Sequence, residues 1–183
     1  MSWKNTTTRY GSLPIALHWL MLALLVAVYC TMEFKGIYKK STPGRDAIMM
    51  WHYMLGLAVF ALVWLRALAR LAGTRPAIEP ALPGWQAALA KAGHWALYAL
   101  MIGLPMLGWL TLSAKGEPIP FFGLELPPLI GKSEALAKTL KAVHEWIAKA
   151  GYFVIGLHAA AALYHHYVRR DNTLRLMLPE KGG

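Results

Sequence analysis

Four uncharged hydrophobic runs constrain this chain more than any other feature of its sequence. None of them contains Asp, Glu, Lys or Arg, and each is 19 to 23 residues long. About 20 helical residues cross the hydrocarbon core of a bilayer, and a helix satisfies its own backbone hydrogen bonds in lipid. We therefore expect four transmembrane helices, which contain the runs Leu13–Met32, Ala47–Leu65, Ala92–Ala114 and Ala150–Val168.

The composition agrees with a membrane protein that forms a single domain over residues 1–183. The chain is 57% hydrophobic and 15% charged, whereas a soluble domain is nearer a quarter charged. The expected fold class is all-α, an integral membrane four-helix bundle. The helices are predicted at about 13–33, 47–71, 86–114 and 133–169.

Three segments outside the runs have their own expected structures. Residues 35–46 contain adjacent Pro and Gly and are typical of a turn-rich loop. Residues 116–132 hold four prolines and are not expected to form a helix. Residues 171–178 are predicted to form a short interfacial helix with Leu174, Leu176, Met177 and Leu178 facing lipid.

Four crossings place both chain ends on the same side of the membrane. That side carries ten Lys and Arg residues, and the other side carries nine. Cytoplasmic loops carry an excess of Lys and Arg, so the difference favours a multi-pass inner-membrane protein with cytoplasmic termini. We expect contact with membrane lipid and no nucleic-acid partner, because no basic face is interleaved with aromatic residues.

Four histidines lie in or beside the hydrophobic runs at matching depths. His18 and His158 are part-way in from the side of the termini, whereas His52 and His144 lie near the opposite side. His144 and His158 are 14 residues apart, about 21 Å and almost four helical turns, so they share one face of a helix. We therefore expect His18 to meet His158 and His52 to meet His144.

Imidazole in hydrocarbon is costly unless it has a partner. Two neutral imidazoles that face each other are the axial ligands of a six-coordinate haem iron, so the pattern predicts two b-type haems. Closed irons favour outer-sphere electron transfer, for which no separate catalytic residue is needed. One shared zinc or copper ion is disfavoured, because it needs three or four ligands close together. Two small metal sites, or histidines that only hydrogen-bond to neighbouring helices, remain alternatives.

Other polar residues near the runs are candidates for binding. His165 lies seven residues after His158 on the same face and could contact a quinone carbonyl, a haem propionate or water. Arg66 and His94 are candidates for haem propionates, and the alternatives are a snorkelling arginine and an ordinary hydrogen-bond partner. The lysines on the outer side either attract a small anion or are membrane-surface charge.

Several motifs resemble the bacterial cytochrome b561 family. The resemblance covers nearly the whole chain and is carried by Ile15-Ala16-Leu17-His18-Trp19, by residues 29–36, by residues 151–167 and by Asp171-Asn172-Thr173-Leu174. It implies a four-helix membrane bundle with two haems b, one ligated by His18 and His158 and the other by His52 and His144. His165 stands where the family's quinone-contacting histidine falls.

The resemblance also implies an activity. Family members of this kind take electrons from periplasmic superoxide and pass them to ubiquinone. Superoxide would then approach the outer haem, attracted by Lys35, Lys39, Lys40 and Lys141. One alternative is a quinone-reducing cytochrome b subunit of a larger dehydrogenase or hydrogenase, which would need a protein redox partner. A second is a non-redox protein that uses its histidines for metal or protons.

Overall fold

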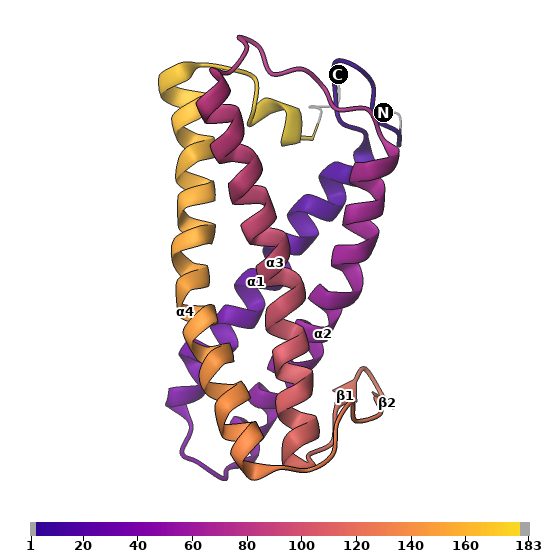
Figure 1. Ribbon diagram of the computed structural model, residues 1–183, viewed down its shortest axis with the longest axis vertical. Coiled ribbons are helices and arrows are strands. Elements are labelled where there is room, and N and C mark those ends of the chain that lie inside the picture. Colours follow the sequence, from indigo (N-terminus) through magenta and orange to yellow (C-terminus); the bar gives the residue numbers. More distant parts are fainter. Residues whose placement is uncertain (1–2, 180–183) are drawn as a thin grey trace. The chain divides into compact units, whose positions relative to one another are not determined.

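The computed structural model describes residues 3–179, and most of them belong to four long helices. Figure 1 shows each helix as one continuous ribbon. Within these residues all four helices are long and apolar enough to cross a membrane. The predicted all-α, four-helix membrane fold is therefore confirmed. The helices are α1 (Ser12–Phe34), α2 (Pro43–Ala72), α3 (Gly84–Lys115) and α4 (Glu134–Tyr164).

The chain divides into two compact units, and every long helix contributes residues to both. The terminal unit contains the residues up to Leu20, Trp64–Ala99 and the residues from Ala150 onward. The hairpin unit contains Met21–Val63 and Leu100–Lys149. That the whole chain acts as one domain stays a prediction. One predicted histidine pair falls in each unit.

Helix α2 begins at Pro43, four residues before the predicted start. Proline is tolerated at the first position of a helix, because the N–H that it lacks would have no intrahelical partner there. The carbonyl of Thr42 accepts a hydrogen bond from the N–H of Asp46 at 3.1 Å, which closes the first turn. The predicted loop is therefore shorter than expected, and it begins with a 3₁₀ turn, Lys35–Ile37.

Helix α4 is α-helical only to Tyr164, and a π-helical turn, His165–Arg169, continues it. Arg170 then adopts a left-handed conformation with φ of 57°, which ends the helix. The predicted interfacial helix in the tail is reduced to a 3₁₀ turn, Arg175–Met177. Its Leu176 is buried rather than lipid-facing, because the tail folds back onto the terminal unit. The indole of Trp19 donates to the Met177 carbonyl at 2.7 Å.

The hairpin unit is closed by the segment after α3, which forms no helix, as predicted. Its strands β1 (Pro120–Phe121) and β2 (Leu124–Glu125) pair antiparallel beside the end of α3 (Figure 1). Phe122 and Gly123 make the turn between the strands with φ of 46° and 88°. A small core of Leu57, Leu112 and Ile119 anchors the segment against α2 and α3.

Many large apolar side chains point outward from the helices. On α4, for example, Phe153 is 80% exposed and Leu157 is 72% exposed. Contiguous exposed apolar surface of this kind is unfavourable in water but suits contact with lipid tails. Lys181, one of the ten Lys and Arg residues counted on the side of the termini, lies outside the described residues.

Candidate functional site

The first predicted histidine pair lies in the terminal unit. The ring centres of His18 on α1 and His158 on α4 are 6.3 Å apart, and the ring planes are inclined by 62°. Neither side chain is fully exposed. The structure therefore brings together, from opposite ends of the sequence, the two rings that were expected to meet.

The second predicted pair lies in the hairpin unit and has nearly the same geometry. The ring centres of His52 on α2 and His144 on α4 are 6.2 Å apart, with ring planes inclined by 73°. Gly108 of α3 faces the His144 ring, and a Cβ atom at this glycine would lie 3.7 Å from Cε1 of His144. A larger side chain at Gly108 would occupy the space beside the ring.

Both spacings suit a single metal ion between two imidazoles. A metal–imidazole bond is about 2 Å long and the nitrogen lies roughly 1 Å from the ring centre, so ligands on opposite sides have ring centres about 6 Å apart. Among residues 3–179, no group of three or more His, Cys, Asp or Glu side chains could hold a bare ion. Each pair would supply two ligands to an iron whose other four ligands come from a porphyrin.

Two oxygen atoms on α1 lie within hydrogen-bond distance of His52 Nδ1, the Val28 carbonyl oxygen at 3.3 Å and the Thr31 hydroxyl. Thr31 Oγ1 lies 2.5 Å from the Val28 carbonyl oxygen and 3.0 Å from His52 Nδ1. A hydroxyl has one proton, which Thr31 donates to the carbonyl, so its oxygen accepts from Nδ1–H of His52. The Nε2 lone pair of His52 is then available to a metal. Sequence reasoning missed Thr31, although a hydroxyl near the outer end of the first hydrophobic run was a usable signal.

A guanidinium and a third imidazole adjoin the pair in the terminal unit. Arg66 Nη2 donates to Nδ1 of His18 at 2.9 Å. Because the guanidinium can only donate, the proton of a neutral His18 is then on Nε2. A metal at Nε2 requires this bond to break, which would release Arg66 to an anionic partner. The ring of His94 on α3 is centred 5.6 Å from that of His158. Both propionate candidates thus lie beside the pair, and their role stays a prediction.

His165, the predicted quinone contact, forms a close pair with a buried carboxylate. Its Nδ1 lies 2.5 Å from Oδ2 of Asp171, whose side chain has no exposed surface. Burial by itself raises the pKa of Asp171, but hydrogen bonds from His165 and Thr173 outweigh it, so the pKa is lowered from its ordinary 3.8. Asp171 was not singled out as a site residue from the sequence.

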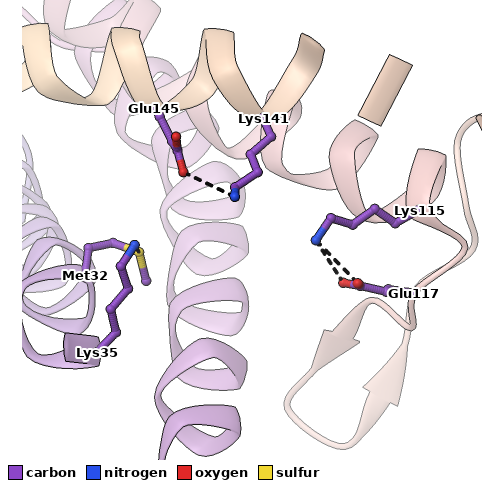
Figure 2. A network of polar contacts seen from close by, with 6 residues as sticks. All are labelled: Met32, Lys35, Lys115, Glu117, Lys141 and Glu145. Carbon is purple, nitrogen blue, oxygen red and sulfur yellow. Dashed lines mark hydrogen bonds and ion pairs between the residues drawn. The ribbon is translucent and has the colours of Figure 1, made fainter. Parts of the chain in front are cut away.

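The predicted anion-steering lysines differ in their surroundings (Figure 2). Lys141 forms an ion pair with Glu145 at 3.7 Å, and the Lys35 ammonium lies 3.6 Å from the Met32 sulfur. Lys39 and Lys40 are exposed in the segment between α1 and α2. Steering stays a prediction for all of them, and the counter-charge beside Lys141 weakens its case.

Comparison with known proteins gives consistent relatives over nearly the full chain. The family model for prokaryotic cytochrome b561 matches residues 9–180. A Yersinia pestis protein named "Probable superoxide oxidase CybB" is 40% identical over 96% of this chain and 98% of its own length. Two Escherichia coli K12 proteins are named "Cytochrome b561 homolog 1" and "Cytochrome b561 homolog 2". The first is 33% identical over 94% of this chain and 98% of its own length. The second is 31% identical over 97% of this chain and 95% of its own length.

Proposed function

This chain belongs to the prokaryotic cytochrome b561 family, and we propose that it oxidises superoxide and reduces ubiquinone. As a family member it is a multi-pass bacterial membrane protein that transfers electrons and uses b-type haem. The proposal adds the number of haems, the electron donor and the electron acceptor. Its net reaction converts two superoxide anions, one ubiquinone and two protons into two dioxygen molecules and one ubiquinol.

The observation that carries the proposal is the similar spacing of two separate histidine pairs, 6.3 and 6.2 Å between ring centres. In this proposal His18 and His158 hold the inner haem, and His52 and His144 hold the outer haem. Haem, when bound, supplies one-electron chemistry between the donor and the acceptor. Two imidazoles would hold each iron, and superoxide would then give up its electron without the help of a catalytic side chain.

Two groups of charged residues would serve the two ends of the reaction. Lys35, Lys39 and Lys40 lie within six residues of one another with no acidic neighbour among them, and they would attract the superoxide anion. Arg66 and His94 would bind the propionates of the inner haem. In this proposal the protein lies in the inner membrane with both termini in the cytoplasm, and His165 would contact the quinone at that side.

A second candidate function is a quinone-reducing subunit of a larger dehydrogenase or hydrogenase. The ion pair between Lys141 and Glu145 favours it, because a neutralised lysine contributes little attraction for a small anion. In that case a protein partner would deliver the electrons at the outer side.

The first test measures the haem content of the purified chain together with its reduced-minus-oxidised spectrum. We expect about two b-type haems per chain, both low-spin. Superoxide is then added to the isolated, haem-replete chain with a short-chain ubiquinone. Ubiquinol formation supports the oxidase. If the chain binds both haems but does not react with superoxide, and a co-purified partner reduces it, the result supports the function as a subunit of a larger complex instead.

A further inference from the structure

After the π-helical turn that follows α4, the chain folds back, and the buried carboxylate of Asp171 contacts the imidazole of His165. The His165 carbonyl accepts the N–H of Asp171 at 3.1 Å, and the left-handed Arg170 makes this reversal possible. The other carboxylate oxygen, Oδ1, accepts the N–H of Thr173 at 3.0 Å. The ring of His165 also packs edge-on against Tyr164, with ring centres 5.8 Å apart.

The next residue fastens this turn to the loop between α2 and α3. Asn172 accepts the Glu79 N–H at 2.9 Å and donates to the Ala77 carbonyl at 3.1 Å. Its backbone N–H donates to the Glu79 carbonyl at 3.1 Å. Asn172 therefore ties the turn to this loop, while the Asp171 carboxylate itself is held by His165 and the Thr173 N–H.

This arrangement decides the tautomer of His165. An ionised carboxylate only accepts hydrogen bonds, so Nδ1 of His165 must carry a proton. The neutral ring then has its lone pair on Nε2, and Nε2 is the atom that can take up a further proton. We propose that Asp171 is a positioning residue: it keeps the proton on Nδ1, so that His165 takes up a second proton at Nε2 and passes that proton to the quinone.

The inference rests on the proposed quinone reduction. The protons that it supplies match the two protons that this reaction consumes. Each ubiquinone accepts two electrons, which originate from two superoxide anions, and two protons. Nε2–H of His165 passes a proton to a quinone oxygen, and cytoplasmic water returns a proton to Nε2 before the second transfer. Asp171 stays ionised throughout. His165 follows the proposed iron ligand His158 by seven residues, a rise of about 10 Å, so proton and electron delivery meet in one unit.

The test uses Asp171→Asn in the haem-replete chain, with the haem reduced chemically so that superoxide is not needed. The Asn oxygen can still accept the Thr173 N–H, but its NH₂ group then faces Nδ1 and reverses the tautomer of His165. Anaerobic mixing with a short-chain ubiquinone should show reoxidation at saturating quinone slowed about 100-fold, the usual contribution of general acid catalysis. The quinone concentration that gives half-saturation should stay within about threefold of the wild-type value. The haem spectrum should be unchanged.

Nitrogen-15 NMR of labelled histidines, assigned by the signal lost in His165→Gln, provides a second readout. We expect an Nδ1–H ring in the wild type and an Nε2–H ring in Asp171→Asn. A double variant, His165→Gln with Asp171→Asn, should be no slower than His165→Gln alone, because the two residues act as one unit.

Asn172→Ala is the matched control, since it loosens the same turn without touching the imidazole. It should reoxidise at close to the wild-type rate. Three results would each overturn the role of Asp171 while leaving quinone reduction intact. They are an equal slowing in Asn172→Ala, a wild-type rate in Asp171→Asn, and an Nδ1–H ring retained in Asp171→Asn. If quinone fails to reoxidise the wild-type haem, the proposed function falls and this role falls with it.

Discussion

Thr31 is the side chain that lies within hydrogen-bond distance of His52 Nδ1, beside the Val28 carbonyl. Its oxygen accepts from His52 Nδ1 because its only proton is used on the Val28 carbonyl. Groups that orient a ligating histidine in this way change metal affinity about 10- to 100-fold. Thr31→Val should therefore weaken haem binding at His52 and His144 by about that factor, measured by haem retention during gel filtration. Thr31→Ser keeps the hydroxyl and should retain haem, and loss of haem from both variants would contradict the role.

Asp171 makes the stability of the chain depend on pH in the acid range. Its pKa is lowered in the folded chain despite burial, through hydrogen bonds from His165 and Thr173. The ionised form therefore stabilises the fold above the ordinary value of 3.8, and this stabilisation is lost as the pH falls through the lower folded pKa. At pH 6.5 Asp171→Asn should lower Tm by about 5 °C, a loss of about 2 kcal/mol.

The same comparison at lower pH checks the sign. Thermal unfolding in detergent, followed between about pH 3 and 7, should show the two melting curves converging as the acid limit is approached. A difference in Tm that grows below pH 4 would mean that the carboxyl is stabilised in its protonated form.

Helix α4 carries one histidine of each pair, so a single substitution on it separates the two centres. His144→Ala leaves His52 without its opposite ring, while His18 and His158 belong to the other unit. We expect the haem content to fall by about half, with the remaining haem still low-spin by its spectrum. Val143→Ala, at the exposed neighbouring position on α4, should keep the full content. Loss of all haem, or of none, would show that the pairs are assigned wrongly.

The orientation expected for the whole molecule comes from its charge distribution, and reporter fusions test it. A fluorescent protein fused after residue 183 should fluoresce, because that end is expected in the cytoplasm. Alkaline phosphatase fused after Lys40 should be active, because the segment between α1 and α2 is expected on the periplasmic side. The reverse pattern would invert the sides proposed for superoxide and quinone.

Electrostatic steering is likewise a property of the summed charge of one face. Replacing Lys39 and Lys40 together by Gln should slow the second-order reaction with superoxide about 10-fold at low ionic strength. The difference should vanish at high salt, where the Debye length is only a few ångströms. Lys91→Gln, on the side of the termini, is the control and should react at the wild-type rate. A salt-independent difference would argue against steering.

The sequence alone predicts the helices, because a charge-free run of about 20 residues in lipid must satisfy its backbone internally. It also indicates which histidines can meet, since the rise of a helix relates residue number to depth. It predicts helix ends less well: Pro43 and the π-turn at His165–Arg169 depend on local hydrogen bonds.

Only the tertiary structure decides which nitrogen of each imidazole is free. The partners of the rings come from elsewhere in the chain: Thr31 is 21 residues from His52, and Arg66 is 48 residues from His18. Asp171 reaches His165 only because Arg170 reverses the chain. A hydrophobic pattern specifies depth and face, but a tautomer is set by one donor or acceptor within about 3 Å, and that contact exists only after the helices have packed.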